Sequence, residues 1–175
     1  MMLYIIRSIV HKLLPTRNPL NRYLKSISEN YQNLNVLEIG SGDTNKNQSA
    51  VHIFSSAYSF VQTDINLNYG HKYLDITSET DLSEKFDLVL VTNVLEHVYE
   101  TNLAIKNLKN LLKDGGHLLV SVPFIYPLHD EPTDFWRFTE HSLKKLFSDF
   151  KILTFKTTGI RQFPIQYILL LQKEN

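Results

Sequence analysis

Two glycines and the carboxylates around them have the residue types of a site for a nucleotide-like ligand. Gly40 and Gly42 enclose Ser41 directly after a short apolar run, and glycine is needed where the backbone turns sharply and a ligand approaches closely. Glu38 lies two residues before this turn, where a charge must find partners. Asp64 follows about twenty residues later, a spacing at which a carboxylate can accept hydrogen bonds from ribose hydroxyls. Together these residues indicate a ligand that carries a ribose.

A third carboxylate supports this interpretation. Asp75 ends another predicted strand, where it could accept a hydrogen bond from the exocyclic amine of a purine. One such acid alone is more often a turn or cap residue, but acids at three consecutive strand ends favour a ligand site. The glycine turn does not complete the Gly-x-Gly-x-x-Gly pattern of dinucleotide-binding proteins, because Asn45 stands where the third glycine belongs. This departure counts against NAD or FAD.

Two of the seven histidines are placed for proton transfer. His97 follows a long apolar run, and His129 lies in the loop after the next one. Imidazole exchanges protons near neutral pH, so His129 and His97 are candidate general bases, with a structural role as the alternative for each. Glu96, His97 and His129 are also of metal-ligating types, but without a further ligand we expect no metal.

Alternating strands and helices must position these residues. An almost continuous apolar run, such as 86–92, is typical of a strand covered on both faces. About seven residues separate the last two predicted strands, too few for a crossover helix, so these strands should form an antiparallel hairpin. The predicted fold is α/β, a mostly parallel seven-stranded sheet with one antiparallel strand. Its strands are expected at 35–40, 58–64, 72–76, 86–92, 117–122, 151–157 and 165–171, and its helices at 45–57, 102–113 and 139–147, with Thr139 as the last N-cap.

The composition excludes several classes of protein. The 175 residues fit one domain and carry eighteen basic and eighteen acidic side chains, a balance without the electrostatic footprint of a nucleic-acid-binding protein. The sequence contains no cysteine, which excludes disulfides, thiolate nucleophiles and Cys-ligated clusters. No apolar run approaches the roughly 18 residues of a membrane span. We therefore expect a cytoplasmic protein that does not bind nucleic acid.

The first residues form a separate segment. Residues 1–14 place apolar side chains at helical spacing and lack the pattern of a signal peptide. One interpretation is a helix packed on its own domain or on a neighbouring subunit; the other is a weak, peripheral contact with a membrane surface. We divide the chain into an N-terminal helical segment, 1–30, and a domain over 31–175, and leave the oligomeric state open.

Three motifs resemble those of the class I S-adenosylmethionine-dependent methyltransferases. The glycine turn within 36–43 is similar to the first motif of the family, residues 86–98 to its fourth-strand motif, here with a Glu-His pair, and residues 111–120 to the helix-turn-strand that follows. This resemblance covers residues 30–172 and implies a Rossmann-like fold with helices on both faces of the sheet and S-adenosyl-L-methionine as the cofactor. Thr44 departs from the pattern, because a third glycine is common there.

The resemblance also implies roles for single residues. Glu38 and the glycine turn would hold the methionine end of the cofactor, Asp64 the ribose hydroxyls and Asp75 the adenine amine. The implied cofactor-binding residues are Glu38, Gly40, Ser41, Gly42, Asp64, Ile65, Asp75, Ile76, Asn93 and Val94.

The acceptor is expected to bind the loop at 123–138, which concentrates aromatic and charged residues. This loop is similar to a stretch in a bacterial branch of the family that is linked to small-molecule, glycan or envelope biosynthesis. Our candidates for acceptor binding are Tyr126, Asp134, Trp136 and Arg137. Trp136 could stack on a ring or sugar, and Arg137 could pair with a carboxylate or phosphate. The alternative is that the aromatic side chains pack in the core while Arg137 binds Asp134 or a backbone carbonyl.

Three functions follow from these features. The first is transfer of a methyl group to an oxygen or nitrogen of a small molecule or of a glycan or envelope precursor. The second is a catalytically silent relative that binds the cofactor or a partner. A nicotinamide-dependent oxidoreductase is the third, and both Asn45 and the final hairpin count against it.

Overall fold

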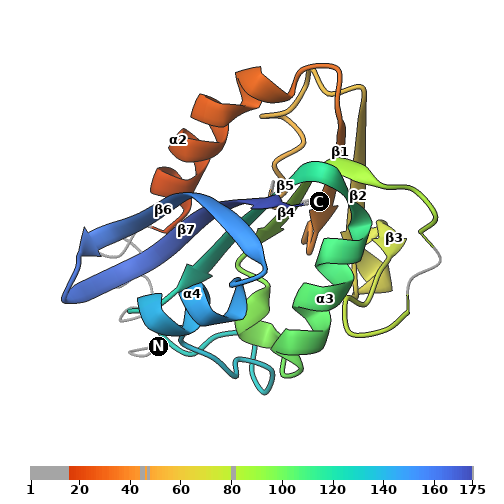
Figure 1. The fold of residues 1–175 in the computed structure, drawn as a ribbon. Helices are drawn as coiled ribbons and strands as arrows, with labels where there is room; N and C mark the ends of the chain where they lie inside the picture. Colours follow the sequence, from red (N-terminus) through yellow and green to blue (C-terminus); the bar gives the residue numbers. More distant parts are fainter. Residues whose placement is uncertain (1–15, 44–45, 47, 80–81, 175) are drawn as a thin grey trace.

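A seven-stranded sheet, with the strand order β3-β2-β1-β4-β5-β7-β6, forms the centre of the computed structural model (Figure 1). The structure describes residues 16–43, 46, 48–79 and 82–174. The strands are β1 (Asn35–Ile39), β2 (Ser59–Asp64), β3 (Lys72–Tyr73), β4 (Phe86–Thr92), β5 (Leu112–Pro123), β6 (Phe150–Ile160) and β7 (Phe163–Lys173). All neighbouring strands pair in parallel except β7, which is antiparallel to both β5 and β6. The predicted Rossmann-like sheet with one reversed strand is confirmed.

Helices cover both faces of the sheet, as predicted. Alternate strand residues point to opposite faces, so β1 gives Leu37 and Ile39 to one core and Val36 to the other. Helices α3 (Thr101–Leu111) and α4 (Glu140–Leu146) pack against the first core. Helix α2 (Arg17–Ser28) packs against the second core, on the face of the sheet opposite to α4 (Figure 1). None of the helices among the described residues is long and apolar enough to cross a membrane.

Short 3₁₀ helices occupy several connections. They are η1 (Glu29–Tyr31), η3 (Leu67–Tyr69) and η4 (Leu95–His97). The last of these follows β4 directly and carries two of the residues that the sequence marks for chemistry, Glu96 and His97.

The predicted helix at 45–57 is wrong for the part of this segment that the structure describes. Residues 49–56 form bends and turns, in which the N–H groups of Ile53 and Ala57 bond carbonyls three residues earlier. The physical reason is competition for the backbone, because the Ala50 N–H donates to the buried Glu38 carboxylate and the Val51 N–H to the Ser49 hydroxyl.

A predicted strand at 72–76 and a predicted helix at 1–14 also differ from the described structure or lie outside it. Strand β3 spans only Lys72–Tyr73, because Asp75 starts a turn that ends the predicted strand at 72–76 early. The predicted helix at 1–14 lies outside the described residues. The first described helix, α2, begins at Arg17.

The final hairpin is longer than predicted. Strands β6 and β7 extend until only residues 161–162 separate them. Gly159, with a φ of +82°, adopts a left-handed conformation near the turn. The register of β6 against β7 shifts twice, between Ile152 and Thr154 and between Thr158 and Gly159.

The cap of α4 gives a prediction of stability. The Thr139 hydroxyl accepts a hydrogen bond of 3.1 Å from the N–H of Ser142, as predicted for an N-cap. Thr139→Ala should lower the free energy of unfolding in urea by about 1 kcal/mol. His141→Ala, an exposed site in the first turn of the same helix, is the control and should change it by less than about 0.5 kcal/mol. Equal stabilities of the two variants would contradict a role for the cap.

Candidate active site

The parallel strands β1, β2 and β4 end at the same edge of the sheet, and this edge gathers most of the predicted residues. The glycine turn follows β1, Asp64 ends β2, and Asn93 follows β4. The N–H of Ser41 donates a 3.0 Å hydrogen bond to the carbonyl of Thr63 at the end of β2. Ligands of open α/β sheets bind outside this edge.

Glu38 is buried in β1 with three donors around its carboxylate. The Ser41 hydroxyl lies 2.9 Å from Oε2, the N–H of Ala50 lies 2.7 Å from Oε1, and the Ser49 hydroxyl also donates to Oε2. Burial raises the pKa of Glu38, and these hydrogen bonds oppose the rise. Glu38 therefore joins the glycine turn to the segment at 49–50.

Both glycines of the turn adopt conformations that other residues avoid. Gly40 has a φ of +68° and Gly42 a φ of +72°. A Cβ on Gly40 would lie 2.5 Å from Cγ2 of Val94, and a Cβ on Gly42 would collide with the Gln48 side-chain oxygen. The turn therefore requires glycine for its backbone conformation and for the close approach of its neighbours.

Asp64 holds the glycine turn from the side of β2. Its Oδ2 accepts from the N–H of Gly42 at 2.9 Å and its Oδ1 from the N–H of Asn66 at 2.9 Å. Asp64 is 7% exposed, whereas the next residue, Ile65, is 64% exposed. The structure thus brings Asp64 and the glycine turn into direct contact, as a ligand site at this edge requires.

Asp75 caps its own turn. Its Oδ1 accepts from the N–H and the hydroxyl of Thr77 at 2.8 and 2.7 Å, and its Oδ2 from the hydroxyl of Ser78. Burial raises the pKa of Asp75, but these hydrogen bonds outweigh it and lower the pKa. The adjacent Ile76 is in the core. The structure places this pair next to the end of β2, because the Leu74 N–H bonds the Asp64 carbonyl.

The side chain of Asn93 bonds the neighbouring strands β5 and β7. The residue has a φ of +54°, and its Oδ1 accepts from the Ser121 hydroxyl at 3.2 Å and from Nε2 of Gln166 at 3.1 Å. The side chain of the next residue, Val94, packs against Gly40. Of this predicted pair, Val94 contacts the glycine turn, while the Asn93 side chain joins β4 to β5 and β7.

The predicted acceptor loop docks on the segment after β4. The backbone N–H groups of Phe135 and Trp136 both donate to the carbonyl of Glu96, at 2.9 and 3.1 Å, and Nε1 of Trp136 donates to the carbonyl of Val98. The ring of Trp136 stacks on Tyr99 with 5.7 Å between centroids, and 63% of Tyr99 is exposed. The loop therefore presents an aromatic surface beside the end of β4.

A hydrogen-bonded chain of three side chains runs through this loop. Arg137 binds both oxygens of Asp134, at 2.6 and 2.7 Å, and also the carbonyls of Tyr126 and Pro127. Oδ2 of Asp134 accepts from the backbone N–H of His129 at 3.0 Å and lies 3.2 Å from its Nδ1. Burial raises the pKa of Asp134, but the hydrogen bonds from Arg137 and His129 lower it to about 2. Arg137 thus makes the internal contacts that were the alternative to acceptor binding.

His97 and His129 meet edge to face, with 4.8 Å between ring centroids. Beside them, Glu96 is completely buried, and neither of its carboxylate oxygens has a hydrogen-bond partner among the described residues. Burial raises the pKa of Glu96 to about 8, and burial together with the neighbouring His129 lowers the pKa of His97. One ligand atom from each of Glu96, His97 and His129 lies within 4.8 Å of the others.

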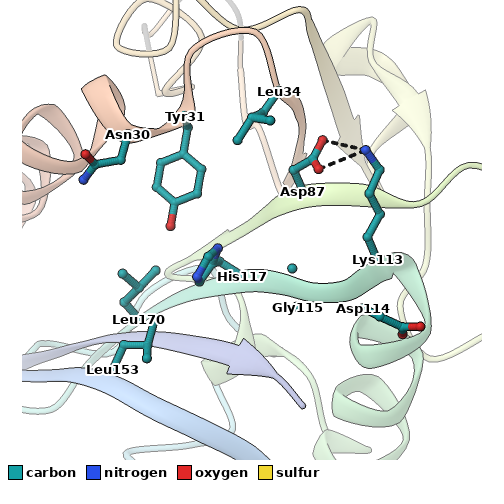
Figure 2. Close-up of a pocket in the computed structure, with 11 residues that line it drawn as sticks. Asn30, Tyr31, Leu34, Asp87, Lys113, Asp114, Gly115, His117, Leu153 and Leu170 are labelled. Atoms are coloured by element: carbon teal, nitrogen blue, oxygen red, sulfur yellow. Dashed lines mark hydrogen bonds and ion pairs between the residues drawn. The ribbon is translucent and has the colours of Figure 1, made fainter. Parts of the chain in front are cut away.

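A separate hollow of about 410 Å³ opens at the other end of β4 and β5 (Figure 2). Tyr31 packs edge to face on His117 there, and Asp87 pairs with Lys113 at 2.8 Å. None of the predicted site residues lines this hollow. This hollow therefore has no part in the predicted site.

Three residues of the site were not identified from the sequence. His71 donates from Nε2 to the carbonyl of Gly42 at 2.8 Å, Gln166 reaches Asn93 from β7, and Tyr99 stacks on Trp136. Only Tyr99 had a signal in the sequence, because it lies two residues after the Glu-His pair at 96–97. His71 and Gln166 act through contacts between distant segments.

Comparison with known proteins relates the chain to a domain family. A family model described as a methyltransferase domain matches residues 2–152. The chain is 32% identical over 128 residues to the highly reducing polyketide synthase GPY1 of Gibberella fujikuroi, and this match covers 58% of the chain but only 5% of that synthase.

Two solved structures have the same fold. N-methyltransferase NodS from Bradyrhizobium japonicum, in complex with S-adenosyl-L-homocysteine, superimposes with a TM-score of 0.67 at 16% identity, covering 97% of this chain and 98% of NodS. The [4+2]-cyclase SpnF superimposes with a TM-score of 0.70 at 14% identity, covering 89% of this chain and 80% of SpnF.

The glycine turn gives a second prediction of stability. Gly70→Ala adds a Cβ in open space at a φ of +77°, so it should cost about 1–2 kcal/mol of backbone strain. Gly40→Ala adds the same strain and a collision with Val94, for a further cost of about 1–3 kcal/mol. Urea unfolding of both variants measures the difference. A smaller loss for Gly40→Ala than for Gly70→Ala would contradict the close approach of Val94.

Proposed function

The chain belongs to the class I S-adenosylmethionine-dependent methyltransferases, and from this premise we propose that it methylates an oxygen or nitrogen of a small molecule. A glycan or envelope precursor is one such acceptor. The observation that carries the proposal is the pair formed by His129 and Asp134 in the loop after β5, beside His97 at the end of the segment that follows β4.

The residues present fit the cofactor. The glycine turn offers a cradle without side chains, and a carboxylate has about four lone-pair positions. The N–H groups of Gly42 and Asn66 each occupy one lone-pair position, on different oxygens of Asp64. Both oxygens can therefore still accept hydrogen bonds from ribose hydroxyls. When bound, S-adenosylmethionine supplies a methyl group on a sulfonium that is already electrophilic. The remaining tasks of the chain are to align the acceptor and to exclude water.

His129 is the proposed activating residue for a hydroxyl acceptor. Its Nδ1 faces the carbonyl of Pro127 and the carboxylate of Asp134, and both groups only accept hydrogen bonds at neutral pH. Nδ1 therefore carries the proton, and Nε2 has the lone pair that a general base needs. Asp134, itself held by Arg137, is a positioning residue for this tautomer.

The aromatic surface supports an acceptor with a ring or sugar. Phe135 and Trp136 are 44% and 37% exposed, and Tyr99 packs against both rings. Exposed aromatic faces beside a nucleotide site suit stacking against such groups. Similarity to part of a polyketide synthase also supports a small-molecule acceptor.

A catalytically silent binding module is the second candidate. The same fold occurs in SpnF, which is named as a [4+2]-cyclase and not as a methyltransferase, so the fold by itself is compatible with this alternative. Cofactor binding without turnover of any acceptor would support it.

Asp64→Ala tests the cofactor site. Loss of a charge-assisted hydrogen bond should weaken S-adenosylmethionine binding by about 1–3 kcal/mol in a calorimetric titration. Asp114→Ala is the control, because Asp114 is 75% exposed and pairs with Lys173 away from the glycine turn. Unchanged affinity in Asp64→Ala would exclude the ribose role.

His129→Ala tests the activating role. Cofactor affinity should stay the same, while kcat on a hydroxyl acceptor falls by about 10²–10⁴-fold, the usual contribution of a general base. The exposed His141→Ala variant should keep both values. Parallel losses of cofactor affinity and turnover would instead assign His129 a structural role.

A further inference from the structure

The positive charge of the sequence is unevenly distributed. The whole chain has no net formal charge, yet residues 1–28 contain five basic side chains and no Asp or Glu. The five are Arg7, Lys12, Arg17, Arg22 and Lys25. The remainder of the chain therefore has a net negative charge, and such an asymmetry indicates a negatively charged partner for the basic part.

Helix α2 turns its basic side chains away from the sheet. Arg22 and Lys25 lie three residues apart and are both exposed, so they share one side of the helix. The opposite side packs against the second core through Leu20, Tyr23, Leu24 and Ile27. The first acid of the sequence, Glu29, is also exposed and follows in η1. The outer side of α2 therefore carries two cations before it meets an acid.

Strand β6 extends this basic surface to the edge of the sheet. Lys156 pairs with Ile168 of the second core, and Lys151 pairs with Gln172, four residues further along β7. Alternate residues of a strand share a face, so both lysines point to the face that α2 covers. Nζ of Lys156 lies 4.3 Å from the centroid of the Tyr23 ring on α2, and β6 itself contains no acid. We call the surface of these cations the basic face; its members are Arg22, Lys25, Lys151 and Lys156.

The tip of the β6–β7 hairpin adds exposed apolar side chains. In Figure 1 the hairpin extends past both α2 and α4. Ile160 and Phe163 pair across its turn and are 62% and 66% exposed. Nε of Arg161 lies 3.4 Å from Oε2 of Glu140 at the start of α4. This ion pair braces the tip against the helix and compensates the charge of Arg161, so Arg161 is not a member of the basic face.

A basic face beside an exposed apolar tip has the composition of a surface that lies on a membrane. Apolar side chains of such surfaces enter the boundary between headgroups and acyl chains, while Lys and Arg contact anionic headgroups. Residues 1–14, which lie outside the described part of the structure, combine apolar side chains at helical spacing with Arg7 and Lys12. The phosphates of a nucleic acid would match the charge but not the apolar tip, so the observations favour a bilayer.

We propose that the basic face and the hairpin tip bind the surface of a bilayer that contains anionic lipids. Ile160 and Phe163 enter the bilayer boundary, and the four cations contact the headgroups. The N–H groups of Phe124 and Ile125 donate to the carbonyls of Ile165 and Pro164. The predicted acceptor loop therefore begins beside the hairpin and comes close to the bilayer in this orientation. Binding to the bilayer requires no methyl transfer and is independent of the proposed function.

The test is sedimentation of the full chain with vesicles of phosphatidylcholine, either alone or mixed with phosphatidylglycerol. We expect binding to the mixed vesicles only, and this binding should weaken as added salt screens the charges. The double variant Arg22→Gln with Lys156→Gln should bind about 10–30-fold more weakly, because one basic side chain near an anionic surface contributes about fivefold. Phe163→Ser should weaken binding by about 3–10-fold, because less apolar area leaves water.

Two matched controls should bind the mixed vesicles as tightly as wild type. Lys106→Gln removes an exposed cation from α3, which packs on the other face of the sheet. Tyr58→Ser removes a side chain that is 80% exposed just before β2, at the opposite edge of the sheet from the hairpin tip. Urea unfolding of each variant identifies those that are folded.

Wild-type protein that does not sediment with the mixed vesicles at low salt would overturn the inference. A double variant or a Phe163→Ser variant that binds as tightly as wild type would do the same. An equal loss in Lys106→Gln would show unspecific attraction between charges and contradict the basic face. Binding of a DNA duplex without binding of vesicles, or a dimer in light scattering that Phe163→Ser dissociates, would assign this surface to a nucleic acid or to a second copy of the chain instead.

Discussion

A carboxylate inside a sheet is costly unless hydrogen-bond donors replace its water. Glu38 lies in the interior strand β1 with only 2% of its surface exposed. Its donors come from the glycine turn and from residues 49–50. The hydroxyl of Thr63 bonds the Glu38 carbonyl and connects β2 to the same point. The positions of the turn and of the segment after it therefore depend on satisfying one buried acid, and the end of β2 is joined to the backbone of the same residue.

A second set of contacts connects the proposed cofactor side to the proposed acceptor side. Val94 packs against Gly40, and two residues later the carbonyl of Glu96 receives both N–H groups from the acceptor loop. The segment after β4 thus lies between the two halves of the site and contacts each of them.

The sequence predicts the strands well because their signals are local or depend on spacing. The apolar run at 86–92 coincides with β4, and the short final connection predicts the antiparallel β7. The helix at 45–57 failed because Glu38, which is distant in sequence, takes the Ala50 N–H. The side-chain oxygen of Asn93 accepts a hydrogen bond from Gln166, 73 residues away, a contact that the sequence does not predict. Contacts of this kind leave no pattern in a single sequence.

The shape of the last strand has a consequence for association between copies of the protein. Strand β6 is an edge of the sheet and carries exposed apolar side chains, including Leu153 at 41% exposure. A long edge strand with apolar side chains would be a template for edge-to-edge pairing and aggregation if it were flat. The two register shifts bend β6 out of a regular ladder, and the exposed Lys151 and Lys156 add charge along it. The opposite edge, β3, is only two residues long, so neither edge offers another chain a regular strand with which to extend the sheet.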